Sequence, residues 1–440
     1  MRVKNLFVKV KFEKKILFNA LWVILDKTIK MIGGLVVGIW FARYLGPQQF
    51  GAWNYVLSLI ALLVPLINLG LNNTLLTDLV KKENKEEIIF TATILKVLSG
   101  SLACLLVIAS AAIFSSDSLI KWLLIIISLQ CVFQFSDIFD IYFQSKTESK
   151  KSVLAKSIAY VLINILKVFA ILNGMSLYVF AVLTVFETVC ALLILSYFYF
   201  WTSNNRISAM RFNWEVGKDL LVRSIPLIVA EIMIVLYTRL DQVMLRNMVG
   251  DMELGKYSAV VRLSELWYFL GLAINVSFYP KLVKLQETGG DKEFFNGLQK
   301  LLNLLSLIAI GIALVVTFSS NLITGLLYGS KYPDIGNILA VHIWTGVFVF
   351  LGVAGGNYFL VNNLQKYFVY RTSIGLIINV ALNFILIPRY GGLGAALATL
   401  VAQMFASFFS NLFIRQTRFL FFMQLKSLVV HFRPAFKNYF

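Results

Sequence analysis

Long apolar segments alternate with short polar gaps along almost the whole chain. Hydrophobic residues make up 59% of its 440 positions. Twelve of the segments have about 20 residues or more, the length that a helix needs to cross a hydrocarbon core ~30 Å thick. They lie at approximately 16–42, 51–79, 89–114, 118–143, 153–173, 177–201, 219–248, 257–280, 298–320, 335–361, 367–388 and 393–415. Lipid gives backbone N–H and C=O groups no partners, and alternating barrel strands do not have such unbroken runs. The segments are therefore predicted to be helices.

The longest central polar stretch divides these segments into two sets of six. We predict a cytoplasmic N-tail at 1–15, a first lobe at 16–201, a linker at 202–218, a second lobe at 219–415 and a basic cytoplasmic C-tail at 416–440. Each lobe has an even number of helices, so both would begin on the same side of the membrane. The predicted fold is an all-α polytopic membrane protein with twelve transmembrane helices in two six-helix lobes. A pseudo-two-fold axis along the membrane normal would relate the lobes.

Two loops, one in each half, support this internal repeat. The first contains Arg43, Gly46, Pro47 and Gly51, and the second contains Arg246, Gly250 and Gly255. Proline cannot continue a helix, and the glycines at 46 and 51 permit the backbone geometry of a tight reversal. We therefore interpret these loop residues as structural.

The positive charges are distributed unevenly between alternate gaps. The N-tail, the even-numbered gaps and the C-tail hold 27 of the 40 Lys and Arg residues, whereas the odd-numbered gaps hold six. Positively charged flanks stay in the cytoplasm during insertion, so both termini are predicted to be cytoplasmic and the protein to lie in the inner membrane. The net charge of +18 then indicates contact with anionic lipid headgroups rather than with nucleic acid.

The sequence shows no pattern typical of catalysis or of metal binding. The three cysteines lie in different segments, without the spacing of a metal site or a disulfide framework. No phosphate-binding loop of the GxxxxGK[ST] type occurs. We predict no catalytic residue, no bound metal and no cofactor other than H⁺ or Na⁺ as a coupling ion.

Charged residues inside the segments are the candidates for function, because each costs about 2.5–3.5 kcal/mol at the centre of a membrane helix. The embedded acids are Asp26, Asp137, Asp140, Glu187, Glu231, Asp241 and Glu265. Four embedded cations are predicted to line a cationic cavity that binds an anionic ligand: Lys27, Lys30, Arg239 and Arg262. The planar arginine fork suits phosphate oxygens. The alternative is neutralisation within the protein, of Lys27 by Asp26 and of Arg262 by Glu265.

Three of the acids are candidates for ion coupling. Glu187 and Lys167 both lie near half-depth, and we predict that they form a buried pair; the alternative is a proton or cation site at Glu187. Asp137 and Asp140 share one face of a helix and form a second possible ion site. For these two acids we favour pairing with Lys96 of the preceding helix.

Three stretches resemble the bacterial polysaccharide repeat-unit flippases, the translocases of O-antigen, capsule and exopolysaccharide. They are 42–55, with its Arg43–Tyr–Leu–Gly46–Pro47 motif, 240–265, and Tyr390–Gly–Gly–Leu–Gly394 before the last segment. The resemblance implies the fold of the multidrug/oligosaccharidyl-lipid/polysaccharide exporters, in which two lobes surround a central cavity and work by alternating access. It implies that undecaprenyl diphosphate carrying an oligosaccharide moves from the cytoplasmic to the periplasmic leaflet.

We predict a transporter rather than an enzyme, because the longest gap, about 17 residues, leaves no large loop to bind a donor and an acceptor. We also predict a functional monomer, with a polysaccharide polymerase and a chain-length regulator as candidate partners. The motifs of the resemblance are structural loops and carry no binding residue over to this chain. A cation-coupled multidrug antiporter of the same fold is the alternative, although its substrates are usually cationic and a cationic cavity has the wrong sign. A membrane glycan polymerase or ligase is an alternative from another class, but it would usually have a large periplasmic loop.

Overall fold

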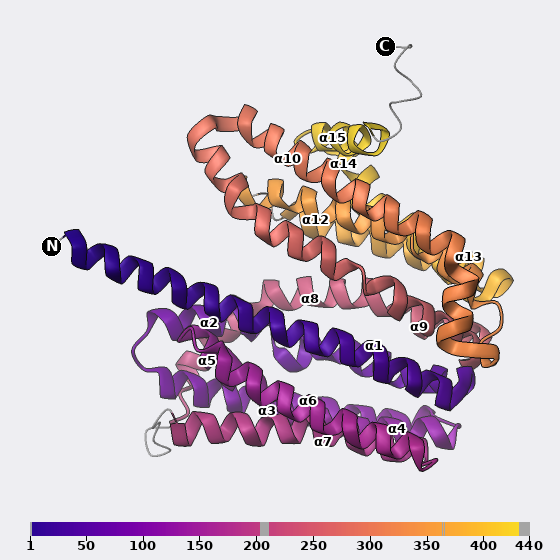
Figure 1. The fold of residues 1–440 in the computed structure, drawn as a ribbon. Coiled ribbons are helices and arrows are strands. Elements are labelled where there is room, and N and C mark those ends of the chain that lie inside the picture. The colour runs from indigo at the N-terminus through magenta and orange to yellow at the C-terminus, as the bar shows by residue number, and fades with distance from the viewer. Residues whose placement is uncertain (1, 203–210, 363, 365, 431–440) are drawn as a thin grey trace, which may run out of the picture. The chain divides into compact units, whose positions relative to one another are not determined.

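The computed structural model describes residues 2–202, 211–362, 364 and 366–430, and for residues 2–18, 20, 21 and 23 it describes the backbone alone. Within these ranges every regular element is a helix (Figure 1). Residues 203–210 of the predicted linker and 431–440 of the predicted C-tail lie outside the described residues. The prediction of an all-helical chain is thus confirmed for the described part.

Nine helical ranges among the described residues are long and apolar enough to cross a membrane. Three of them contain a glycine whose backbone is not helical. Those that interrupt a helix internally, rather than flank one, are Gly46 in the range Ile24–Lys81, Gly290 in Asp251–Lys331 and Gly391 in Lys366–Phe413. The predicted number of twelve spans is not confirmed by this count and stays a prediction.

The chain forms two compact units. Unit 1 comprises Met1–Tyr44 and Val56–Ile232, and unit 2 comprises Leu45–Tyr55 and Met233–Phe440. The short segment around the first predicted loop thus belongs to unit 2, although the helices on either side of it belong to unit 1. The predicted lobes at 16–201 and 219–415 stay a prediction.

Unit 1 is built from the following helices, with the last one continuing into unit 2: α1 (Arg2–Asn68), α2 (Leu71–Lys81), α3 (Lys85–Phe114), α4 (Ser118–Phe133), α5 (Asp137–Ser145), α6 (Ser149–Leu172), α7 (Leu177–Tyr197) and α8 (Trp214–Val249). The short turns η1 (Gln134–Ser136) and η2 (Phe198–Thr202) precede α5 and follow α7. Leu75, Phe139, Tyr142 and Tyr199 form part of its buried apolar core. Contacts of α4 with both α3 and α7, and of α6 with α7, hold the long helices together.

Unit 2 contains α9 (Asp251–Glu265), α10 (Tyr268–Tyr328), η4 (Gly329–Lys331), α11 (Ile335–His342), α12 (Thr345–Val361), α13 (Lys366–Met404), η5 (Phe405–Phe409), α14 (Ser410–Phe413) and α15 (Arg418–Val429). Helix α10 bends sharply (Figure 1), and Gly290 within it has a φ of 65°. Helix α15 lies in the predicted C-tail and packs on α10 with Leu420, Gln424 and Ser427 buried. The basic composition of this stretch did not indicate that one face of it is buried.

The first glycine of each predicted loop reverses the chain as expected. Gly46 has a φ of 70° and Gly250 a φ of 95°. A side chain at either position would be strained, because only glycine adopts positive φ without steric cost. This part of the loop prediction is confirmed.

The second glycine of each loop has a different role from the one predicted. Gly51 lies within helical backbone, so it does not take part in the reversal. A Cβ on Gly51 would lie 1.8 Å from the carbonyl oxygen of Asp251, and a Cβ on Gly255 would lie 1.9 Å from that of Pro47. These glycines are needed because the two loops pack backbone against backbone within unit 2.

Candidate functional site

The predicted ligand-binding cations of unit 1 lie on α1. The Lys30 ammonium is 2.9 Å from Asp26 Oδ2 in an ion pair one helical turn apart, and its side chain is 37% exposed. Asp26 therefore pairs with Lys30 rather than with its neighbour Lys27, because positions four apart share a helix face and adjacent positions do not. Lys27 is exposed, and no ion pair of Lys27 is found in the described part of the chain.

The predicted cations of unit 2 lie on α8 and α9. Arg239 is half-buried, and no hydrogen bond or ion pair of its guanidinium is found among the described residues. The Arg262 guanidinium lies over the ring of Phe50, 5.8 Å from its centroid. Glu265 is close enough to both arginines to interact with them electrostatically. The shared ligand role of Lys27, Lys30, Arg239 and Arg262 stays a prediction.

Asp137 and Asp140 have a different partner from the one we favoured. Lys156 on α6 lies 2.6 Å from Asp140 Oδ2 and 3.4 Å from Asp137 Oδ1. Lys96 is fully buried, and its ammonium instead donates to the side-chain oxygens of Asn68, at 3.2 Å, and Asn72, at 3.1 Å. Both α3 and α6 pack against α5, but the Lys96 side chain of α3 is directed to the break between α1 and α2, where Asn68 and Asn72 accept its hydrogen bonds. The pairing with Lys96 was thus wrong.

The predicted pair of Lys167 and Glu187 is confirmed. The Lys167 ammonium on α6 lies 3.2 Å from Glu187 Oε2 on α7, and the two side chains are 19% and 28% exposed. Every acid proposed from the sequence as an ion-coupling site, namely Glu187, Asp137 and Asp140, therefore has a lysine partner.

Asp241 is an embedded acid of unit 2 with a different environment. It is 5% exposed, and its Oδ2 accepts a 2.5 Å hydrogen bond from the hydroxyl of Tyr257. Its Oδ1 accepts a 2.7 Å bond from the backbone N–H of Gln242. No Lys or Arg ion pair of Asp241 is found within the described ranges. The hydrogen bonds that hold this carboxylate thus come from neutral donors.

Polar groups extend from Asp241 through Tyr257 to α13. The hydroxyls of Tyr257 and Thr399 lie 3.2 Å apart, and Asn379 Nδ2 donates to Thr399 Oγ1 at 3.4 Å. Asn383 Nδ2 donates to Asn379 Oδ1 at 2.9 Å, while its own buried Oδ1 has no hydrogen-bond partner among the described residues. Carboxylate, amide and hydroxyl oxygens are the ligands of hard cations, and a carboxylate also takes up a proton.

Sequence reasoning identified Asp241 as embedded but not as part of a site. It gave Asn379 and Thr399 no role in a site. Their distance along the chain from residue 241 gave no indication that the fold brings them together. The sequence feature that could have predicted this site is the presence of an embedded acid together with embedded Asn and Thr side chains in the second half of the chain.

Solved membrane transporters share the fold of this chain. The structure of the lipid II flippase MurJ in an inward closed conformation matches with a TM-score of 0.74 and 18% identity, over 96% of this chain and 93% of that chain. An inward-facing multidrug resistance MATE family transporter of the MOP superfamily matches with a TM-score of 0.74 and 12% identity, over 93% and 96%. The chain is thus an all-helical, multi-pass membrane protein with the MOP transporter fold.

The sequence comparisons identify the family. The polysaccharide biosynthesis protein family matches residues 16–286, which are more than half of the chain. The chain therefore belongs to this family. The capsular polysaccharide biosynthesis protein CapF of Staphylococcus aureus is 27% identical over 191 residues, 43% of this chain and 48% of CapF. The match thus spans about half the length of that relative.

Proposed function

We propose that this protein flips undecaprenyl-diphosphate-linked oligosaccharide repeat units from the cytoplasmic to the outer leaflet of a bacterial inner membrane. The observation that carries the proposal is the membership of a MOP-fold chain in the polysaccharide biosynthesis family. Such a chain moves its substrate by alternating access and needs no catalytic residue. A surface glycan such as O-antigen or capsule would be the final product, with a polymerase and a chain-length regulator acting after the flippase.

The non-helical glycines support twelve membrane spans. Gly46, Gly290 and Gly391 each lie inside one of the nine long apolar ranges among the described residues. If each of these three ranges crosses the membrane twice, the spans number twelve and both termini lie on one side. The positive-inside distribution makes that side the cytoplasm. Reporter fusions at Glu287 should then read cytoplasmic, and fusions at Asn173 and Lys331 extracytoplasmic.

The embedded cations support an anionic cargo. Arg239 is half-buried with no ion pair among the described residues, and its guanidinium offers the paired N–H donors that bind phosphate in a bidentate manner. Lys27 and Lys30 add positive charge on α1. We propose that Arg239 makes the principal contact with the diphosphate and that Lys27, Lys30 and Arg262 assist it. These charges disfavour the cationic substrates of a multidrug antiporter.

We further propose that Asp241, rather than Glu187, Asp137 or Asp140, takes up the coupling H⁺ or Na⁺. The other three acids are already compensated by lysines, so a cation would have to displace a bound ammonium. Asp241 has no direct ion pair among the described residues and interacts with Arg239 only at longer range. Tyr257, Thr399 and Asn379 provide further oxygen atoms nearby. A buried carboxylate without a paired counter-charge is unfavourable in a membrane, so cation binding would stabilise one state of the transport cycle.

Deletion of the gene in its host tests this function. Lipid-linked repeat units should accumulate in the cytoplasmic leaflet and surface polysaccharide should fall, because polymerisation would lack its substrate. Expression of the intact chain from a plasmid should restore the glycan. Normal surface polysaccharide in a deletion strain without another flippase would contradict the proposal.

A further inference from the structure

Arg371 of unit 2 is a buried cation for which the sequence pattern indicated no role. It lies near the start of α13 and is only 5% exposed. A buried guanidinium stays protonated because its pKa in water is above 12, so the fold holds a full positive charge here.

The hydrogen bonds of Arg371 leave part of its guanidinium unpartnered. Nε donates to the carbonyl oxygen of Ala406 at 2.7 Å, and Nη2 donates to that of Ser407 at 3.5 Å. Both acceptors lie in η5, a π-helical turn, where the widened backbone leaves carbonyls available to side chains. Nη1 is buried and has no hydrogen-bond partner within the described residues.

Among the described residues, no carboxylate balances this charge. No ion pair of Arg371 with Asp or Glu is found there, and the guanidinium is compensated by the two carbonyl dipoles and by the ring of Phe359, 5.0 Å from the guanidinium carbon. A buried charge without a counter-charge carries a large desolvation cost. The group that would compensate it is an anion.

A cavity of ≈ 230 Å³ lies beside Arg371. Besides Arg371, its polar lining comes from Tyr237, Thr372, Gln403 and Ser407. Tyr237, Gln403 and Ser407 form a directed chain of hydrogen bonds. The Tyr237 hydroxyl bonds to Gln403 Oε1, and Gln403 Nε2 donates to Ser407 Oγ at 2.7 Å. Because Ser407 Oγ accepts this bond, its own proton is available for donation to a ligand.

The remaining lining is suited to an apolar chain. Ile234, Val349, Val353 and Phe368 contribute aliphatic and aromatic walls, and no acidic side chain is found among the described residues that line the cavity. A ligand here would therefore meet N–H and O–H donors at one part of the wall and hydrocarbon elsewhere. That combination fits a phosphate group attached to a hydrocarbon chain, and the polar part alone also fits free phosphate.

Gly352 on α12 keeps space open at the polar part of the cavity. A Cβ at this position would lie 2.5 Å from Ser407 Oγ and 3.4 Å from Arg371 Nη2. At Gly356, one turn further along the same helix, an added Cβ would have no atom of another described element within 4 Å. The two glycines therefore give a matched pair of variants. An alanine at Gly352 would place its methyl group in the polar part of the cavity, and an alanine at Gly356 would leave the cavity unchanged.

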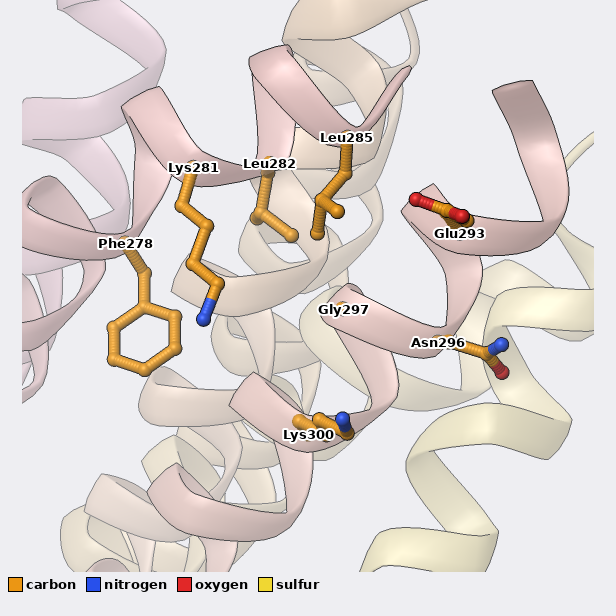
Figure 2. Close-up of a pocket in the computed structure, with 8 residues that line it drawn as sticks. All are labelled: Phe278, Lys281, Leu282, Leu285, Glu293, Asn296, Gly297 and Lys300. Atoms are coloured by element: carbon orange, nitrogen blue, oxygen red, sulfur yellow. The ribbon is translucent and has the colours of Figure 1, made fainter. Parts of the chain in front are cut away.

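A second cavity, at the bend of α10, lacks these properties. Figure 2 shows Lys281 on one arm of the bend and Glu293 and Lys300 on the other. All three side chains are exposed, so water satisfies their charges. The lining also mixes both signs of charge and thus does not select an anion.

We propose that the Arg371 cavity binds a phosphate-type oxyanion, with the Arg371 guanidinium and the Ser407 hydroxyl as donors. The proposal concerns a site within unit 2 and does not depend on the identity of the transported glycan. A phospholipid headgroup and free phosphate share the required chemistry. The hydrogen bonds from the Arg371 guanidinium to the carbonyl oxygens of Ala406 and Ser407 would be present both with and without the ligand.

Binding of three probes to the purified full chain in detergent tests this site, with microscale thermophoresis as the readout. The probes are dioleoyl phosphatidic acid, dioleoylglycerol with the same chains and no phosphate, and inorganic phosphate. Phosphatidic acid should bind the wild type and Gly356→Ala equally well. Arg371→Gln and Gly352→Ala should each weaken its binding at least about tenfold, the effect of losing a charge-assisted contact.

Competition by inorganic phosphate identifies the source of the oxyanion. Displacement of phosphatidic acid by phosphate would support free phosphate as a ligand, and tight binding of phosphatidic acid without such displacement would support a lipid headgroup. Equal affinity of the wild type for phosphatidic acid and dioleoylglycerol would overturn the proposal, and this comparison needs no variant. Unchanged phosphatidic acid binding by folded Gly352→Ala or Arg371→Gln would overturn it as well.

Discussion

Gly51 lies so close to Asp251 that a Cβ on residue 51 would be 1.8 Å from the Asp251 carbonyl oxygen. The reciprocal contact of Gly255 with the Pro47 carbonyl, 1.9 Å from a Cβ placed in the same way, repeats the arrangement on the other loop. The two loops that carry the sequence repeat are therefore joined by their backbones. Side chains add to this contact, since the Arg246 guanidinium lies 4.6 Å from the ring centroid of Tyr55.

Alanine at position 51 should destabilise the protein. The added methyl group would meet backbone, which cannot rotate away, so the loops must separate; overpacking of this kind typically costs about 1–3 kcal/mol. Thermal denaturation of the purified protein in detergent measures the effect. Gly311→Ala on α10, where no atom lies within 4 Å of the added Cβ, is the control and should melt like the wild type. Equal melting temperatures for both variants would contradict the backbone contact.

The Lys167–Glu187 pair should behave as a coupled unit. Alanine at either position leaves the other charge uncompensated in the membrane, whereas alanine at both removes the two charges together. The double variant should therefore be more stable than the sum of the single losses implies, by about 0.5–3 kcal/mol of interaction free energy. Thermal denaturation of the four proteins in the cycle gives this value. Strictly additive losses would show that the 3.2 Å contact contributes nothing to stability.

Sequence patterns predicted the helices well because apolar segments of bilayer length leave few alternatives. They predicted Gly46 and Gly250 well for a local reason, since chain reversal after a helix requires positive φ. Gly51 could not be understood in this way, because its neighbour Asp251 is distant in sequence. The same limit explains why the fold brings Asp241 to Tyr257 and Thr399 without a recognisable spacing.

Charge pairs were predictable only in part. Depth along the helices matched Lys167 with Glu187, and the structure confirms that pair. Depth in the membrane could not decide which lysine contacts Asp140. Lys96 lies on a helix that precedes Asp140 in the sequence, and Lys156 lies on a helix that follows it. Both α3 and α6 contact α5. Helix α3 is rotated so that Lys96 reaches Asn68 and Asn72, while Lys156 of α6 reaches Asp140. Rotation of a helix about its axis is set by its tertiary contacts, which a single sequence does not give.

Asp241→Asn should uncouple transport from the ion gradient. The amide keeps the size of the side chain and its bond to Tyr257 but cannot take up a proton or balance a sodium ion. Export by this variant should no longer respond to an imposed H⁺ or Na⁺ gradient in membrane vesicles. Glu287→Gln, at an exposed acid of α10, should respond as the wild type does. A gradient response retained by Asp241→Asn would exclude this carboxylate as the coupling site.

Arg239→Ala should abolish export while the protein still accumulates in the membrane, since no ion pair of Arg239 is found among the described residues. Arg239→Lys should recover only part of the activity, because an ammonium lacks the bidentate fork. Lys30→Ala should also reduce export, with an added loss of stability from the unpaired Asp26. Surface glycan staining, normalised to protein level, is the measurement, and Lys284→Ala at an exposed lysine is the control. Wild-type export by both alanine variants would remove the cationic-ligand argument.

Flipping by the purified protein is the most direct test of the account. Liposomes are prepared with undecaprenyl-diphosphate-linked repeat units in both leaflets, and a membrane-impermeant glycosidase reports the fraction of glycan that is accessible from outside. With the wild-type protein the glycan of the inner leaflet should also become accessible over time, and with Arg239→Ala it should not. An accessible fraction that stays the same with and without wild-type protein, in vesicles where a known flippase raises it, would contradict the proposed function.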